Sequence, residues 1–387
     1  MIRRLPLLLA ILPLLASCTA YGQAQQAQDP PGTWYFAVSG DSRDCGDLIM
    51  PKIAHAVAED RGHPAAFYWH LGDFRRMYGP DCDVVKRTHP DWDCKARPES
   101  LLGPEEMSHY LETAWDDFIE RQVCPFAPTQ VFLGIGNHEL AAGRTRTEFQ
   151  RKFQPWLTSG PIHNQRVQEA NGHFYSTEGA TFYHFVKNGV DFIYLDNAGD
   201  DADFSAEELA WLENILNRDK ANADIKAIVA GMHAALPYSR ESRHAMDTTC
   251  QGLCSGQRAY DLLYRMQLEK MGGKRVYVFA SHSHLFVDKL FETPEHEGQV
   301  IKGWLAGAAG AEQYRKDPEP IQYGYALVAV HPDGKLDVRF REMKRDSPPL
   351  ASGPGAEPLT AFCFEQNKHD KGSDAFTKAC ACGQAQP

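Results

Sequence analysis

Residues 130–139 read Gln-Val-Phe-Leu-Gly-Ile-Gly-Asn-His-Glu, an apolar run followed by a glycine and three polar side chains. The run Gln130–Ile135 is short and rich in β-branched and aromatic residues, which is typical of a buried strand. Four other runs have the same character and also end at polar residues: Trp34–Ser39, Ala66–Leu71, Ile225–Ala230 and Arg275–Ala280. The pattern predicts buried strands whose ends carry chemically reactive groups.

Segments with helical periodicity lie between these runs: Asp47–Glu59, Pro104–Arg121, Ser205–Asn217 and Gln257–Met271. Ser205 stands at the start of its segment with Glu208 three residues later, which is the order of a helix cap. Strands that alternate with helices favour an α/β core. Further strands are expected as a β-meander and near the end of the chain: His173–Thr177, Thr181–Val186, Val190–Leu195, Gln299–Leu305, Tyr323–His331 and Leu336–Met343.

The residues that follow the five strands form an ordered set: Gly40-Asp41-Ser42-Arg43, Gly72-Asp73, Gly136-Asn137-His138-Glu139, Gly231-Met232-His233 and Ser281-His282-Ser283-His284. The carboxyl ends of parallel strands meet at one edge of an α/β sheet, so we expect these side chains to converge. The strand period of two aims the rings of His282 and His284 to the same side. Carboxylate, amide and imidazole groups suit Zn, Fe or Mn, and the sequence therefore predicts a metal site.

The order and strand context of these motifs resemble the calcineurin-like metallophosphoesterase superfamily, which includes the purple acid phosphatases. The resemblance covers roughly residues 34–343. It implies a four-layer α/β/β/α sandwich and a centre of two metal ions. It also implies that Asp73 bridges the two metals, that Asn137, His233 and His282 complete one of them, and that Asp41 and His284 hold the other.

The resemblance further implies that His138 lies beside the substrate phosphate and that Glu139 orients it. There His138 stabilises developing charge or protonates the leaving oxygen. Two cations would neutralise a phosphoester and lower the pKa of a bound water. The expected activity is therefore hydrolysis of a phosphate monoester or diester by a metal-activated water. The alternative is a degenerate, non-catalytic member that binds a phosphorylated ligand or a protein partner.

The first motif departs from the superfamily pattern, because Arg43 stands where most members have a metal-binding histidine. A guanidinium stays protonated and does not ligate a metal. Three interpretations follow: the metal at Asp41 and His284 is weakly bound, Tyr78 reaches it as a ligand, or Arg43 replaces its charge. In each case Arg43 is also a candidate catalytic residue, since its planar fork suits a phosphate.

Charge limits the partners of this protein. The formal net charge is −11, which disfavours general affinity for nucleic acid or for an anionic membrane surface. A small anionic substrate would need a local positive site, which metal ions would supply. We therefore expect a small phosphorylated substrate and no binding to nucleic acid.

The N-terminus has the features of an export signal. Arg3 and Arg4 precede the apolar stretch 5–16, which is too short to span a membrane as a helix. The tetrapeptide Leu15-Ala16-Ser17-Cys18 resembles a bacterial lipobox, with Cys18 as the lipidated first residue. The alternative is ordinary signal-peptide cleavage nearby. Residues 1–17 are thus expected to be a signal peptide and 18–32 a flexible tether. We expect an exported lipoprotein of the bacterial cell envelope, on the periplasm-facing outer membrane, with the lipid anchor as its only membrane contact.

The phosphoesterase domain is expected over residues 33–344, with an inserted loop at 77–103 and a cysteine-bearing tail at 345–387. An oxidising compartment favours disulfides among the nine cysteines after Cys18. By loop length the expected pairs are Cys82 with Cys94 and Cys250 with Cys254. Cys363 is expected to join one of the two cysteines at 380 and 382, and an odd count leaves at least one thiol unpaired.

Overall fold

The computed structural model describes residues 29–95, 102–171, 180–240, 244–267, 273–353 and 355–370, together with Cys380 and Cys382. The expected signal peptide, Cys18 and the strand His173–Thr177 lie outside the described residues, as does most of the tether. Within these ranges no helix is both long and apolar enough to cross a membrane.

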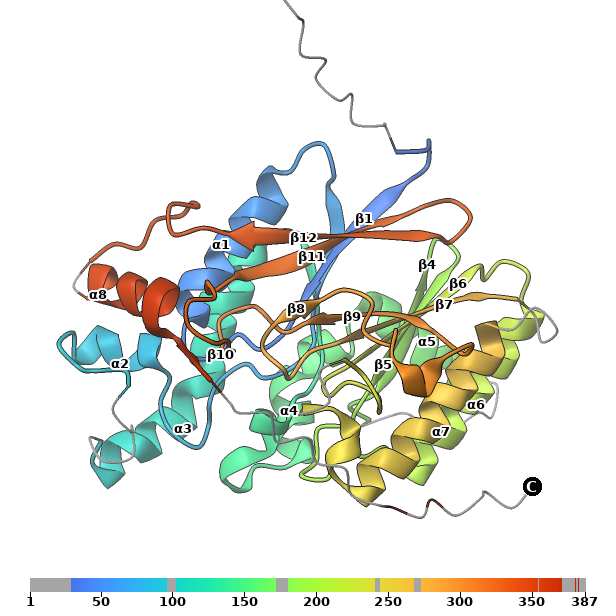
Figure 1. Cartoon of the computed structure of the whole chain (residues 1–387), viewed down its shortest axis with the longest axis horizontal. Coiled ribbons are helices and arrows are strands. Elements are labelled where there is room, and N and C mark those ends of the chain that lie inside the picture. The colour runs from blue at the N-terminus through green and yellow to red at the C-terminus, as the bar shows by residue number, and fades with distance from the viewer. Residues whose placement is uncertain are drawn as a thin grey trace, which may run out of the picture.

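Two sheets form the centre of the molecule (Figure 1). The first has the strand order β12-β11-β1-β2-β3, in which β1, β2 and β3 are parallel and β11 and β12 run antiparallel. Its strands are β1 (Trp34–Ser39), β2 (Ala65–His70), β3 (Gln130–Leu133), β11 (Tyr323–Val330) and β12 (Leu336–Met343).

The second sheet has the order β4-β5-β6-β7-β9-β8, with β5, β6, β7 and β9 parallel. Its strands are β4 (Tyr183–Lys187), β5 (Val190–Leu195), β6 (Ala227–Met232), β7 (Arg275–Ala280), β8 (Phe286–Val287) and β9 (Lys302–Ala306). A separate two-stranded sheet pairs β10 (Gln313–Tyr314) with β13 (Lys368–His369). All five strands with polar ends match their expected bounds within two residues, and β6 begins and ends two residues late.

Helices cover the outer faces of both sheets (Figure 1). The helices are α1 (Gly46–Glu59), α2 (Cys82–Thr88), α3 (Pro104–Phe118), α4 (Arg146–Leu157), α5 (Gly160–Asn171), α6 (Ala206–Ala221), α7 (Cys250–Gln267) and α8 (Ala356–Ala361). Helix α1 packs on the first sheet, while α6 and α7 lie together on the second. The expected four-layer α/β/β/α sandwich is therefore confirmed.

Two helix starts show how local signals operate. Ser205 caps α6 as expected, because its hydroxyl accepts a hydrogen bond from the Glu208 amide. Helix α7 begins seven residues before the expected start at Gln257, since Thr249 accepts a hydrogen bond from the Gly252 amide. The two glycines in its first turns weaken the helical pattern in the sequence. A Cβ at Gly256 would lie 2.6 Å from Pro237, so packing against the neighbouring loop explains one of them.

Aromatic side chains fill the space between the two sheets. Phe67 of β2 packs edge-on against Phe192 of β5 at 5.1 Å between ring centroids, and Phe132 of β3 stacks on Phe185 of β4 at 4.0 Å. A Cβ on Gly231 of β6 would come within 2.4 Å of the Trp69 ring, so only glycine allows this approach. Face-to-face packing therefore aligns the carboxyl ends of strands from both sheets.

The disulfides tie the periphery to this core, and only part of their pattern was predicted. Cys82–Cys94 forms as expected. The expected pair Cys250–Cys254 is wrong, because Cys250 bonds Cys380 and Cys254 bonds Cys382. The expected partner of Cys363 is also wrong, since it bonds Cys45 at the start of α1. Both expectations favour pairs of cysteines that are close in sequence. Cys250 and Cys254 instead lie one turn apart in a helix, where each can bond a cysteine of the C-terminal segment.

The insertion is held by a buried arginine rather than being an open loop. The described part of the insertion contains α2. Arg75 lies just before the insertion, and its fully buried side chain reaches into the region between α1, α2 and α3. Its guanidinium lies 2.7 Å from both Asp47 and Asp117, 3.2 Å from Asp83 and 3.9 Å from Asp81. One cation thus binds carboxylates from three helices and from the loop before α2.

We predict that Arg75→Met lowers the free energy of unfolding by about 3–5 kcal/mol, because it leaves buried carboxylates without a counter-charge. Arg87→Met is the matched control, since Arg87 contacts the same Asp47 and Asp117 but its side chain is 33% exposed. That change should cost at most about 1 kcal/mol. Urea unfolding with the disulfides intact measures both, and equal losses would contradict the role given to Arg75.

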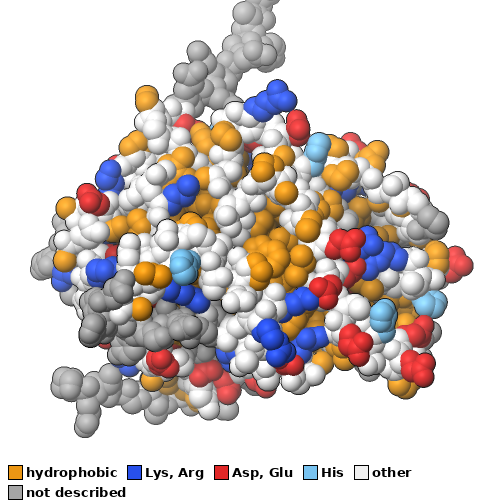
Figure 2. Space-filling view, turned by 180° about the vertical axis from the view of Figure 1, so that it is seen from behind, with side chains coloured by type: hydrophobic (Ala, Val, Ile, Leu, Met, Phe, Trp, Pro, Cys, Tyr) orange, Lys and Arg blue, Asp and Glu red, His pale blue; other side chains and the backbone are white. Residues whose placement is uncertain are grey.

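The molecular surface mixes charges of both signs. Figure 2 shows acidic and basic side chains interspersed over the described part of one face, with hydrophobic side chains gathered near its centre. The net charge of −11 is therefore not the result of one acidic surface on this side.

Candidate metal centre

The loops after β1, β2, β6 and β7 bring together a set of metal-binding side chains at one edge of both sheets. One ligand atom from each member lies within 4.8 Å of the others, and the members are Asp41, Asp73, His233 and His282. Asp41, Asp73 and His233 are buried, and His282 is partly exposed. Since β1 and β2 belong to the first sheet and β6 and β7 to the second, the cluster forms only where the two sheets meet.

His233 has its proton position set by the backbone. Its Nδ1 lies 3.0 Å from the Leu71 carbonyl, to which it donates a hydrogen bond. Its Nε2 then faces two oxygens, Oδ1 of Asn137 at 3.0 Å and Oδ1 of Asp73 at 3.3 Å. Three electron-pair donors facing one another need a cation between them, either a proton or a metal ion.

The electrostatics of the cluster show the same demand for positive charge. Burial opposes a charged imidazole, yet the nearby Asp73 and Asp41 carboxylates raise the pKa of His233 to about 9. Burial raises the pKa of Asp41 to about 7. Although burial acts in the opposite direction, neighbouring histidines and Arg43 hold the pKa of Asp73 well below its ordinary value. A metal ion would satisfy all three groups at once.

Four residues of the site have left-handed backbone conformations. Asp41, Asp73, His282 and His284 have φ values of 60°, 61°, 71° and 52°. This region is uncommon for residues other than glycine, although Asp and His visit it more often than most. Such conformations concentrate at functional sites, where the surrounding structure compensates their cost. They also remove the expected alternation of His282 and His284, because β7 already ends at Ala280.

Glu139 holds the loops after β2 and β3 together. Its carboxylate accepts hydrogen bonds from the backbone amides of Asp73, Phe74 and Gly136, each at 2.8 Å. The two loops touch so closely that a Cβ on Gly72 would lie 2.5 Å from the Gly136 nitrogen. Glu139 therefore contacts backbone amides rather than the His138 ring, and it positions the backbone that carries Asp73.

Arg43 lies inside the site, with only 7% of its surface exposed. Its Nη1 lies 2.5 Å from Nε2 of His138, and its Nη2 lies 2.9 Å from Nε2 of His284. Nη1 also donates to the Tyr78 hydroxyl at 3.3 Å. The side chain that the sequence left ambiguous thus occupies the space between two histidines of the expected site.

His138 and His284 are both oriented by backbone carbonyls. Nδ1 of His138 donates to the Arg76 carbonyl at 2.6 Å, and Nδ1 of His284 donates to the Glu312 carbonyl at 2.6 Å. Their Nε2 atoms are therefore acceptors that face Arg43. Burial and Arg43 lower the pKa of His138 to about 4, so this imidazole is neutral in the structure.

Aromatic and imidazole rings form one wall of the site. Tyr314 stacks on His284 at 4.7 Å and on His244 at 4.8 Å, and His244 meets His282 edge-on at 5.1 Å. His244 lies in the loop that follows the His233 motif. Tyr314 belongs to none of the sequence motifs, and it lies in β10, which pairs with β13 of the C-terminal segment.

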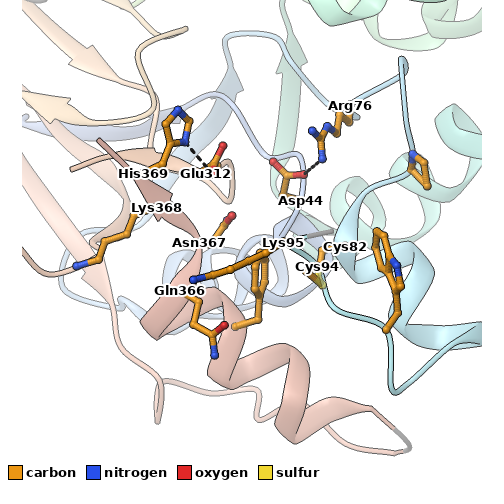
Figure 3. A pocket seen from close by; sticks show the side chains of 13 residues that line it. Asp44, Arg76, Cys82, Cys94, Lys95, Glu312, Gln366, Asn367, Lys368 and His369 are labelled. Atoms are coloured by element: carbon orange, nitrogen blue, oxygen red, sulfur yellow. Dashed lines mark ion pairs between the residues drawn. A yellow bond between two sulfur atoms is a disulfide. The ribbon is translucent and has the colours of Figure 1, made fainter. Parts of the chain in front are cut away.

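A cavity of about 530 Å³ adjoins the site. Figure 3 shows Asp44 and Arg76 on one side of it, and Gln366, Asn367 and Lys368 of the C-terminal segment on another. Cys82 and Cys94 bring the insertion to its wall. Residues that line the cavity also adjoin the site. Asp44 follows Arg43 in the chain, and the carbonyls of Arg76 and Glu312 accept hydrogen bonds from His138 and His284.

Comparison with known proteins supports the fold. No protein-family model matches the chain, and no curated protein sequence matches it significantly. Among solved structures, the purple acid phosphatase PPD1 from yellow lupin (Lupinus luteus) seeds aligns with a TM-score of 0.50 at 12% identity. The chain has a purple acid phosphatase-like fold. The alignment covers 81% of this chain but 52% of the phosphatase, so the chain spans about half the length of that enzyme.

Two other solved structures align less closely. PhoD gives a TM-score of 0.47 at 13% identity, with 82% of this chain and 72% of PhoD covered. GAP50, described as the anchor in the inner membrane complex of Plasmodium, gives 0.41 at 11% identity, with 87% and 97% covered. At these identities the likeness concerns the fold, and any function must be argued from the site.

We predict that Glu139→Gln lowers the free energy of unfolding by about 2–3 kcal/mol, because the amide group retains one acceptor oxygen for three buried N–H groups. Urea unfolding of the metal-free chain measures the change. Glu105→Gln, at an exposed position in the first turn of α3, is the control and should have no measurable effect. Burial and the Asp73 carboxylate raise the pKa of Glu139 to about 8, so unfolding is measured above this pH, where Glu139 is ionised. Equal unfolding midpoints for the Glu139 variant and the original chain would contradict the hydrogen-bonding role given to Glu139.

Proposed function

We propose that this protein is a metal-dependent phosphoesterase that hydrolyses a phosphate monoester or diester. The observation that carries the proposal is the convergence of Asp73, Asn137 and His233 donor atoms, with His282 beside them, at the joint edge of the two sheets. Nδ1 of His282 is buried and has no hydrogen-bond partner among the described residues, which leaves it available as a ligand.

Asp73, Asn137, His233 and His282 would hold the metal ion, and Asp41 is close enough to join them. These residues fit a Zn, Fe or Mn ion, because they combine carboxylate oxygens with imidazole nitrogens. When bound, such an ion supplies Lewis acidity and an activated water. Since Asn137, His233 and His282 are neutral ligands, most of the metal's positive charge would remain available to attract a phosphate.

Arg43 and His138 would act on the substrate side of the site. Arg43 carries a permanent positive charge and binds a phosphate oxygen through its remaining N–H groups. We propose that His138 assists by holding the guanidinium in place through Nε2. Protonation of a leaving oxygen by His138 would require that contact to open, because the ring's proton is on Nδ1 in the structure.

We also propose that the protein works in the bacterial cell envelope. The N-terminal sequence motivates export, with Cys18 as the lipid-bearing residue of a lipoprotein on the periplasm-facing outer membrane. The four disulfides suit an oxidising compartment. The substrate would be a small phosphorylated molecule, and the net charge of −11 argues against nucleic acid.

A second candidate is a non-catalytic protein that binds a phosphorylated ligand. The position of Arg43 favours it, since the guanidinium contacts both His138 and His284. Turnover measurements separate the two candidates, because binding without hydrolysis would leave the phosphoester intact.

We predict turnover of aryl phosphate mono- or diesters by the purified chain with added Mn, Zn or Fe, and its loss on chelation. His233→Ala should lower kcat/KM by about 10²-fold or more, because it removes a ligand. His55→Ala is the matched control, since His55 is exposed on α1 and is not a member of the metal-binding cluster. Absence of both metal binding and turnover would refute the enzyme, and phosphate binding without turnover would support the second candidate.

A further inference from the structure

The half of the site around His284 differs from a metal-binding half. Its Nε2, the atom that would face a metal, accepts a hydrogen bond from Nη2 of Arg43 at 2.9 Å. The other ring nitrogen is fixed as a donor to the Glu312 carbonyl, so the ring has no second lone pair to offer. A metal would need Nε2 at about 2.0–2.1 Å in the same direction. The guanidinium and a metal therefore compete for one lone pair.

His138 strengthens the hold on the guanidinium. Its Nε2 accepts from Nη1 of Arg43 at 2.5 Å, and the Tyr78 hydroxyl accepts from the same nitrogen at 3.3 Å. Arg43 is 7% exposed, so these contacts are largely shielded from water. A guanidinium does not lose its proton under these conditions, and its charge is permanent. A second metal would thus be placed against a fixed cation.

The carboxylate expected on this half lies instead within reach of the other half. Asp41 groups with Asp73, His233 and His282, all with one ligand atom within 4.8 Å of one another, and His284 is not a member of that group. Oδ2 of Asp41 accepts a hydrogen bond from the His282 amide at 2.7 Å, while Oδ1 lies 3.7 Å from Nε2 of His284. Asp41 is therefore close enough to join the metal position of Asp73, His233 and His282. The Nε2 lone pair of His284 is already taken by Arg43.

We propose that this protein binds one metal ion per chain and that the Arg43 guanidinium takes the place of the second. The inference rests on the proposed function and narrows it to a mononuclear site with a built-in organic cation. Arg43 supplies positive charge and N–H donors to a phosphate, but it does not activate a water. Its Nε is buried and unpartnered within the described part of the chain, which leaves a donor for a substrate oxygen.

The metal count of the folded chain tests this proposal directly. The full mature chain is loaded with Mn²⁺, freed of excess metal, and analysed by mass spectrometric metal determination and by electron paramagnetic resonance. We expect one Mn²⁺ per chain and the spectrum of an isolated ion. Two ions per chain with an exchange-coupled spectrum would overturn the proposal while leaving the phosphoesterase function in place. A chain that binds no metal would overturn both.

Substitution of Arg43 tests whether this residue is the reason that a second metal ion does not bind. Arg43→His removes the fixed charge and adds a ligand beside His284, so we expect the count to rise from one Mn²⁺ per chain to two. Arg43→Lys keeps the charge and should stay at one. Arg76→His, on a neighbouring loop and partly exposed, is the matched control and should also stay at one.

Circular dichroism establishes that each variant is folded before its metal is counted. A folded Arg43→His variant that still binds only one ion would overturn the proposal that Arg43 takes the place of a second metal. If that variant does not fold, the Arg43→Lys count decides, since two ions beside a retained charge would likewise contradict the proposal.

Discussion

Face-to-face packing of two sheets is the constraint on which the site depends. The first sheet contributes Asp41, Asp73 and Asn137, and the second contributes His233 and His282. Aromatic side chains between the sheets, such as Phe67 against Phe192, set how the strand ends are aligned. A ligand cluster drawn from two sheets is therefore only as well ordered as the aromatic layer that joins them, and changes in that layer would shift donor atoms relative to one another.

The loops at this edge are held in unfavourable backbone conformations by specific contacts. Asp73 has a φ of 61°, and the Glu139 carboxylate binds its amide and those of two neighbours. Backbone carbonyls in turn fix the tautomers of His233 and His284. The donor atoms are thus positioned before any ion arrives, which reduces the reorganisation needed to bind one.

The two halves of the expected two-metal centre differ chemically. One half brings donor atoms of Asp73, Asn137 and His233 close together, and this cluster attracts a cation. The other half already contains one, because Arg43 is enclosed by His138 and His284. A guanidinium brings charge and directional N–H groups without Lewis acidity. The site therefore combines a place for a metal with a fixed phosphate-binding cation.

The sequence by itself determined the longer strands of both sheets, four of the eight α-helices in the described part of the chain, the α/β/β/α class and the set of residues at the strand ends. These follow from local periodicity and composition, which act over a few residues. It did not determine the partners of Cys250 and Cys363, the role of Glu139 or the position of Arg43. Those depend on which distant loops meet: Cys45 with Cys363, for example, are 318 residues apart. Only the tertiary structure decided them, because the direction of a lone pair is set by contacts from elements far apart in the chain.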